Sequence, residues 1–365
     1  MRRRLMAGLG VLIALLAFSV PASVAAHDFA RVGTVYTITN SGAGNDVFAY
    51  SRASDGSLSL LGTYATGGTG TGAQLASQGS VTLSADGRWL ATVDAGSNDV
   101  ALFAVAPDGS LHLSSRVAAG GTEPISVTLH GPFVYVLDAG TSNIAGFVNL
   151  FGHLVALPGS TRPLSGAGTS PEEIAFSPDG GWLVVTEKGT NDLVTYRVGF
   201  LGIAGAPSAY TSAGAAPYGF AFDSQGQLFV TEAAGSALSS YTVSPAGAPT
   251  VISASVANGQ LAACWVALTP DGRYAFTIDA HNAAISSYAI ANNGSLTLVN
   301  GTAFLQATSS IPLLDASVSG DGRFLYVVDV GTNTIDAFRI GPGASLSAIG
   351  STSGLPAGAG GLAAS

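Results

Sequence analysis

A sequence repeat runs through this chain, and the residues just before its short apolar stretches are mostly small or apolar. Five side chains depart from that pattern. They are Glu172, Glu173, Tyr218, Trp265 and Asp315. Adjacent or facing carboxylates in a dry site raise one another's pKa, which suits one of them to act as a general base in hydrolysis. Tyrosine and tryptophan rings stack on ring-shaped ligands. The alternative interpretation is that Trp265 fills a central channel and that the two glutamates are solvated residues at its rim.

Three more side chains are expected near this position. Glu123 stands just before Pro124, Lys188 is the only lysine in the chain, and His281 comes two residues after Asp279. A histidine oriented by a carboxylate serves as a general base, although a histidine in a turn is often simply exposed. The candidate catalytic residues are therefore Glu172, Glu173 and His281, and the candidate binding residues are Glu123, Lys188, Tyr218, Trp265 and Asp315.

Several well-known catalytic motifs do not occur in the sequence. There is no Gly-x-Ser-x-Gly, no His-Glu-x-x-His and no phosphate-binding loop, so a classical serine hydrolase, a zinc peptidase or a nucleotide site is not indicated. The single cysteine, Cys264, has no obvious histidine partner. We therefore expect it to be a small buried residue rather than a nucleophile.

The elements that must position these residues follow from the repeat. Its clearest mark is a turn with glycine in second place, at Asp86-Gly87, His130-Gly131, Asp179-Gly180, Gln225-Gly226, Asp271-Gly272 and Asp321-Gly322. The glycines are 44 to 50 residues apart, which is the period of a four-stranded propeller blade. Each turn follows a short apolar stretch such as Val81–Leu83 and precedes a hydrophobic run such as Phe324–Val328. The short stretch is the predicted innermost strand, crowded toward the axis.

The first repeat lacks its innermost strand. It starts with Val35–Thr39 and continues through Val47–Ser51 and Leu58–Tyr64. Gly361–Ser365, at the other end of the sequence, matches the missing strand. Six complete repeats and this split one predict an all-β fold, a seven-bladed β-propeller of four-stranded blades. It would be closed by the N-terminal strands together with a C-terminal inner strand, which argues against an open solenoid of repeats.

The residues that end the seven predicted second strands are mostly acidic. They are Asn40, Asp94, Asp138, Glu187, Glu232, Asp279 and Asp329, and all but Asn40 carry a carboxyl group. One interpretation is that each carboxylate accepts hydrogen bonds from amides of the turn that follows it. The other is an acidic ring that attracts cations, with Ca²⁺ as the candidate cofactor. No aspartate-rich loop with EF-hand spacing is present, so the sequence does not identify which residues would bind the metal.

Several motifs resemble those of a known family. Tyr36–Asn40 is similar to the Tyr-Val-Thr-Asn repeat of secreted β-propellers, and the turns at Ser84–Arg88 and Gly331–Asn333 fit the same pattern. Together they look like the lactonase-type seven-bladed propellers, which include 6-phosphogluconolactonase-like and carboxymuconate-cyclase-like proteins. The resemblance covers the chain after its leader and implies a carboxylic ester hydrolase. Active relatives are expected to carry arginine and histidine beside glutamate at the channel mouth. Neither enters the inner-strand series here, which argues against a phosphosugar lactone.

The N-terminus predicts export. Arg2, Arg3 and Arg4 precede an apolar segment at Leu5–Phe18, and Val24–Ala26 offers small residues for cleavage before His27. This is the pattern of a signal peptide over residues 1–26, followed by a single domain over 27–365. Cleavage leaves ten basic residues against 22 acidic ones, a formal charge of −12. Such a surface disfavours nucleic acid, anionic membranes and phosphorylated substrates.

Two functions are consistent with this sequence. The first is a secreted, extracellular or periplasmic lactonase-like propeller that hydrolyses a neutral lactone or cyclic ester at the channel mouth. Glu172 or Glu173 would be the base, with His281 or Lys188 as the electrophilic group. The second is a non-catalytic extracellular propeller that binds a protein or a glycan on the same face. We expect a monomer with no membrane span after cleavage.

Overall fold

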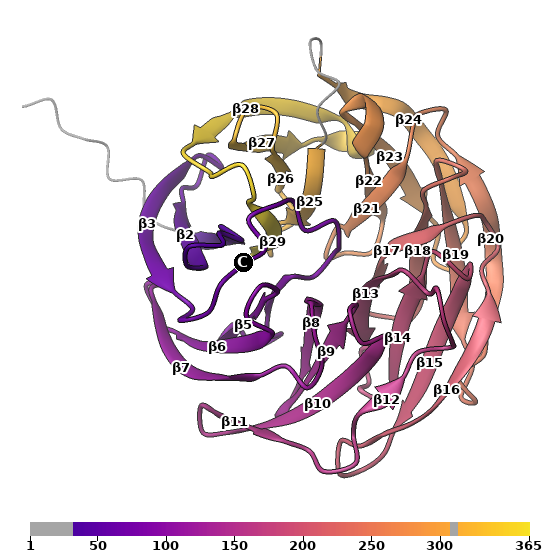
Figure 1. Ribbon diagram of the computed structural model, residues 1–365. Helices are drawn as coiled ribbons and strands as arrows, with labels where there is room; N and C mark the ends of the chain where they lie inside the picture. Colours follow the sequence, from indigo (N-terminus) through magenta and orange to yellow (C-terminus); the bar gives the residue numbers. More distant parts are fainter. Residues whose placement is uncertain (1–31, 307–312) are drawn as a thin grey trace, which may run out of the picture.

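The strands of this protein form seven sheets arranged around a central axis (Figure 1). The structure is a computed structural model that describes residues 32–306 and 313–365. The predicted signal peptide over residues 1–26 lies outside the described residues. No helix in the described part of the chain has the length and apolar character needed to cross a membrane. The predicted all-β, seven-bladed propeller is confirmed.

Each blade has four antiparallel strands. The innermost strands are β29 (Gly360–Ala364), β4 (Val81–Leu83), β8 (Pro124–His130), β13 (Pro171–Phe176), β17 (Pro217–Phe222), β21 (Ala263–Leu268) and β25 (Leu313–Val318). The second strands are β1 (Gly33–Ile38), β5 (Trp89–Asp94), β9 (Phe133–Asp138), β14 (Trp182–Glu187), β18 (Gln227–Glu232), β22 (Tyr274–Asp279) and β26 (Phe324–Asp329).

The outer half of each blade is more exposed than the inner half. The third strands are β2 (Asp46–Arg52), β6 (Asp99–Val105), β10 (Asn143–Leu150), β15 (Asp192–Val198), β19 (Ala237–Val243), β23 (Ala284–Ile290) and β27 (Thr334–Ile340). The fourth are β3 (Leu58–Ala65), β7 (Leu111–Ala118), β11 (His153–Ala156), β16 (Ala204–Thr211), β20 (Pro249–Ala257), β24 (Leu296–Leu305) and β28 (Leu346–Ser353). A short strand β12 (Arg162–Pro163) also pairs with β10, and two 3-10 turns occupy Ala280–Asn282 and Pro342–Ala344.

The ring is closed by the two ends of the domain. Strand β29 pairs antiparallel with β1, placing Ala364 opposite Val35 and Ala363 opposite Tyr36. The amide of Ser365 also donates to the carbonyl of Thr34 at 2.9 Å. The predicted closure is therefore correct, with β29 beginning one residue earlier than the pattern indicated. The C-terminus lies near the centre of the ring (Figure 1).

Tyrosines of the second strands join neighbouring blades. The hydroxyl of Tyr36 donates to the carbonyl of Gly109 at 3.0 Å, and Tyr135 donates to Gly202 at 2.7 Å. Tyr326 makes the equivalent bond to Gly56 at 2.8 Å across the closure. Each ring is buried between two sheets while its hydroxyl finds a carbonyl partner, as a buried tyrosine requires. These bonds fix the angle between adjacent blades.

The residues that end the second strands are all fully buried. Most of their partners lie in the connection that arrives from the preceding blade. Asp94 accepts from Asn45 and Thr66, Glu232 from Ser212, and Asp279 from Asn258. Among the hydrogen bonds of the described residues, only Asp329 accepts from two amides of the turn that follows it, those of Gly331 and Thr332. The predicted turn-capping role therefore needs correction, because these carboxylates mainly hold the incoming chain of the neighbouring blade.

Burial changes the acidity of several of these carboxyl groups. It raises the pKa of Asp94 to about 6 and the pKa of Asp138 and Asp279 to about 7, because the charged form loses its hydration. Within the described ranges no group of three or more histidine, cysteine or acidic side chains could hold a metal ion. The acids are therefore separate buried groups, each with its own hydrogen bonds.

Candidate functional site

A long connection between β3 and β4, residues 66–80, runs across the middle of the ring (Figure 1). We call its inner part, residues 75–79, the plug. Its backbone carbonyls accept hydrogen bonds from two of the predicted site residues. The Tyr218 hydroxyl donates to Ala76 at 2.7 Å, and the Trp265 indole donates to Ser77 at 3.0 Å. The plug thus closes the central channel near the end at which the connections enter the inner strands.

Gln78 anchors the plug with its side-chain amide. Its Nε2 donates to the carbonyls of Phe220 and Val266 at 3.2 and 3.1 Å, and its Oε1 accepts from the Val266 amide at 3.1 Å. A Cβ on Gly219 would lie 2.2 Å from that Oε1, so only glycine leaves room for this contact. Sequence reasoning missed Gln78, because it lies in the connection before the predicted inner strand Val81–Leu83, outside the repeated strands and turns.

Irregular pairing at the start of the inner strands sets the direction of the site residues. The register shifts between Pro171 and Glu173 in β13, between Ala263 and Trp265 in β21, and between Leu313 and Ala316 in β25. A bulge re-aims the side chains around it and is common beside functional sites. Glu172 and Glu173, which are adjacent in sequence, line two different cavities, since successive side chains of a strand point in opposite directions.

The mouth pocket is the cavity on the connection side of the plug. Its volume is about 570 Å³, and it lies between the plug and blades three and four. Glu123, Glu172 and Lys188 all line it, together with Thr71, Leu75 and Ser170. Glu123 is exposed at φ +56°, held there by a bond from its amide to Asn98 Oδ1 at 2.7 Å. Three of the predicted site residues therefore share one open pocket.

Glu172 is a buried acid at the wall of the mouth pocket. It is only 4% exposed and forms an ion pair with Lys188, whose side chain is 40% exposed. Burial raises the pKa of Glu172 to about 7, because loss of hydration outweighs the opposing effects of Lys188 and Tyr218. The Lys188 ammonium also lies 5.1 Å from the centre of the Tyr218 ring. Near neutral pH this carboxyl can both release and accept a proton, as a general base must.

The aromatic pair beneath the ion pair is buried. Tyr218 and Trp265 are 5% and 2% exposed, and their rings meet edge to face with centroids 5.4 Å apart. The Tyr218 hydroxyl and the Trp265 indole are both bonded to the plug, and the Lys188 ammonium lies over the Tyr218 ring. Neither ring lines the mouth pocket. Cys264 is buried beside them, and burial raises the pKa of its thiol to about 12, which keeps it protonated.

The other predicted site residues lie outside the mouth pocket. Glu173 and Asp315 line a separate channel cavity on the far side of the plug. His281 is exposed in the 3-10 turn Ala280–Asn282 and its amide donates to the carbonyl of Leu261 at 3.2 Å. The described structure therefore joins Glu172, Lys188 and Glu123, and separates them from Glu173, Asp315 and His281.

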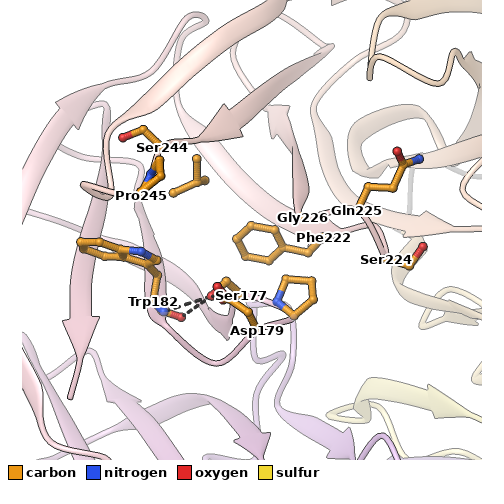
Figure 2. A pocket seen from close by; sticks show the side chains of 11 residues that line it. Ser177, Asp179, Trp182, Phe222, Ser224, Gln225, Gly226, Ser244 and Pro245 are labelled. Carbon is orange, nitrogen blue, oxygen red and sulfur yellow. Dashed lines mark hydrogen bonds between the residues drawn. The ribbon is translucent and has the colours of Figure 1, made fainter. Parts of the chain in front are cut away.

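A groove on the opposite face, between blades four and five, is lined by Asp179, Trp182, Phe222 and Pro245 (Figure 2). Its volume is about 500 Å³. The Ser177 hydroxyl bonds Asp179 at 2.6 Å and accepts the Trp182 amide at 3.0 Å, as part of the turn. Similar grooves lie between blades six and seven and between blades one and two. The feature therefore belongs to the repeat and does not mark a specific site.

Comparison with known proteins supports the interpretation of the fold. The family model "Lactonase, 7-bladed beta-propeller" matches residues 30–149 and 228–361. A comparison with curated proteins found no match. The unmatched stretch, residues 150–227, contains Glu172, Lys188 and Tyr218, so the family match says nothing about these residues.

Solved structures with the same fold are distant in sequence. A periplasmic gluconolactonase from Pseudomonas aeruginosa is 16% identical, with a TM-score of 0.73 over 91% of this chain and 98% of that one. A candidate 6-phosphogluconolactonase from Bacteroides fragilis is 18% identical, with a TM-score of 0.70 over 94% of this chain and 100% of the other. These likenesses concern the fold alone. Because the family model spans well over half of the sequence, the chain belongs to the lactonase family of seven-bladed β-propellers.

Proposed function

We propose that this protein is an exported hydrolase that opens a neutral lactone or related cyclic ester in the mouth pocket. The observation that carries the proposal is the buried Glu172, paired with Lys188 at the wall of an open pocket of about 570 Å³. Membership of the lactonase family supports the reaction class. Glu172 is the proposed base and Lys188 the proposed electrophilic group.

The proposed reaction uses one water molecule. Ionised Glu172 takes a proton from the water molecule while the water oxygen attacks the lactone carbonyl carbon. The Lys188 ammonium stabilises the negative charge that develops on the carbonyl oxygen. The ring C–O bond then breaks, and the leaving oxygen receives the proton that Glu172 had taken. The product is a hydroxy acid, whose new carboxyl group ionises by releasing its proton to water. The resulting anion then leaves a pocket that also contains Glu123.

The substrate is proposed to be uncharged. Among the described residues that line the mouth pocket, Lys188 is the only basic one, and Glu172 already engages it. Glu123 adds a second carboxylate at the rim. A phosphorylated lactone would bring further negative charge into this acidic surrounding, which is unfavourable. Neutral aldonolactones and acyl lactones are the ligands of choice.

The test compares lactone hydrolysis by the wild type with that of Glu172→Gln and Lys188→Met. Loss of a general base typically lowers the rate by on the order of 10² to 10⁴, so Glu172→Gln should lose most activity. Glu123→Gln is the matched control, because it removes a carboxylate from the same pocket without removing the base. It should retain activity within about threefold. Hydrolysis no faster than in buffer, or full activity in Glu172→Gln, would disprove the proposal.

A non-catalytic binding propeller is the second candidate, and the plug is the observation that favours it. Residues 75–79 fill the channel near its mouth, which leaves a broad surface pocket suited to a protein loop or a glycan. In that case no lactone would be hydrolysed, and a panel of immobilised glycans and extracellular proteins would reveal a ligand whose binding is weakened by Glu123→Gln.

Export is part of the proposal and has its own test. The basic residues at 2–4, the apolar segment Leu5–Phe18 and the small residues before His27 support cleavage after Ala26. N-terminal sequencing of protein recovered from outside the cytoplasm should begin at His27. Recovery of uncleaved protein from the cytoplasm would contradict export without affecting the catalytic proposal.

A further inference from the structure

A second cavity occupies the central channel beyond the plug. Its volume is about 300 Å³, at the lower end of the range for pockets that hold small molecules. Gln78 and Gly79 close it on the plug side. At the other side it reaches Leu268 and Val318, the last residues of β21 and β25 before their turns. The cavity therefore opens on the turn face, opposite the mouth pocket.

Two buried carboxyl groups lie at the plug end of this cavity. Glu173 is 6% exposed and Asp315 is 3% exposed. Asp315 accepts hydrogen bonds from the amides of Ala316 at 2.8 Å and Leu362 at 3.2 Å, with Gly79 at 3.5 Å. These amides hold the Asp315 carboxyl in place at the channel wall.

Glu173 is only half satisfied. Its Oε2 accepts the Phe220 amide at 2.6 Å. Its Oε1 accepts no hydrogen bond from any residue that the structure describes, although the side chain lines the cavity. A carboxylate oxygen that faces a cavity and meets no donor of the protein keeps its lone pairs available to a ligand or to water. This oxygen is therefore a vacant acceptor at the end of a cavity that a ligand can enter.

Neither carboxyl has a cationic partner in the cavity. No lysine, arginine or histidine is among the described residues that line it. Burial raises the pKa of Asp315 to about 7, and burial together with Asp315 raises the pKa of Glu173 well above its usual range. By contrast, the adjacent Glu172 forms an ion pair with Lys188. The channel thus holds two acids whose ionisation a ligand cation would favour.

The walls of the cavity indicate which kind of cation fits. Most lining residues have small or apolar side chains, among them Val81, Ala221, Val266, Ala267 and Leu362. The polar side chains of Gln78, Thr82 and Ser317 also line the cavity, and each already has a hydrogen bond to the backbone of the ring. A calcium ion takes six to eight oxygen ligands, and such walls do not supply them. A primary ammonium group needs only a few acceptors, and an attached hydrocarbon body matches apolar walls.

We propose that the channel cavity binds a small primary ammonium compound with an apolar body. Its N–H groups donate to Glu173 Oε1 and to the Asp315 carboxylate, and its hydrocarbon part lies along β17, β21 and β29. This site is separate from the mouth pocket. It stands or falls independently of lactone hydrolysis.

The test is isothermal titration of the full protein with n-butylammonium chloride at pH 8, where a primary amine is still protonated. 1-Butanol is the neutral probe of the same shape. The ammonium should bind at least tenfold more tightly than the alcohol. Glu173→Gln and Asp315→Asn should each weaken the binding by on the order of 10- to 100-fold, as expected for loss of a charge-assisted hydrogen bond.

Two further variants separate a binding defect from misfolding. Ala221→Leu narrows the channel without touching either carboxyl and should also abolish binding. Asp336→Asn is the matched control, because Asp336 is a buried acid that does not line the cavity, and it should bind as the wild type does. Equal affinities for butylammonium and butanol, or unchanged binding in Ala221→Leu, would overturn the proposal. So would calcium binding that is lost in Glu173→Gln, since that would identify a metal site.

Discussion

Substitution of Asp138 by asparagine should remove most of the destabilisation that this buried carboxyl group causes when it ionises. Asp138 ends β9, is fully buried, and accepts a single hydrogen bond, from Asn143 Nδ2 at 3.0 Å. Its other oxygen, Oδ1, is buried and has no hydrogen-bond partner among the described residues. Asparagine has nearly the same shape, and its carbonyl can accept the same bond from Asn143. The substitution therefore changes charge while largely preserving the packing.

The magnitude follows from the shift in acidity. The pKa of Asp138 rises from 3.8 to about 7 on folding. Because the folded state binds the proton more tightly, ionisation of this group lowers stability as the pH rises. The full penalty is about 4 kcal/mol at high pH, and about 2.5 kcal/mol of it develops between pH 5 and pH 8. Asp138→Asn should lack this pH-dependent loss.

Urea unfolding at pH 5 and pH 8 measures the effect. The variant should be more stable than the wild type by about 1.5 kcal/mol at pH 5 and by about 4 kcal/mol at pH 8. Asp329→Asn is the matched control, since Asp329 accepts bonds from Gln306, two backbone amides and the Thr332 hydroxyl. It should lose stability at both pH values. If wild type and Asp138→Asn instead show parallel pH dependence, Asp138 does not ionise in the way its burial implies, and the reasoning is refuted.

Three further predictions concern closure, cations and catalysis. Deleting residues 360–365 removes β29 and leaves β1 as an open edge, so the melting temperature should fall markedly or the protein should become insoluble; unchanged melting would contradict the closure. Because the acids of the second strands are separate buried groups, melting in millimolar Ca²⁺ and in chelator should coincide, and a clear rise with Ca²⁺ would show that they cooperate. With a pKa of about 7, Glu172 gains its basic form as the pH rises, so kcat/KM should increase through pH 7 and level off above it. A flat profile from pH 5 to 9 would exclude Glu172 as the base.

The repeat made the architecture predictable from the sequence. Turns such as Asp321-Gly322 require a residue at positive φ, and Gly322 has φ +71°. The match between Gly361–Ser365 and the other inner strands predicted the closure. The first blade lacks an inner strand and the C-terminal segment supplies one, so the two are expected to pair. These signals are local, and each blade repeats them.

The site was less predictable because it depends on contacts between distant segments. The sequence analysis grouped Glu172 and Glu173 in one site, whereas in the structure they line cavities on opposite sides of the plug. Neither is a solvated rim residue, since both are buried. The plug lies outside the repeated strands and turns, and the partners of Gln78 are backbone groups of Phe220 and Val266, whose positions no residue type reveals. Only the assembled ring brings them together.

The plug also has a consequence for how this protein folds. The hydrogen bonds of Gln78 reach Phe220 and Val266, up to 188 residues away in sequence, and the amide of Gly79 reaches Asp315. These bonds can form only after the later blades are in place, so docking of residues 75–79 is a late event. Contacts of such long range slow folding. Once formed, they connect blade two to blades five, six and seven across the axis, so one blade cannot open without disturbing the others. Blade-by-blade unfolding, the usual behaviour of open repeat arrays, should give way to a single cooperative transition.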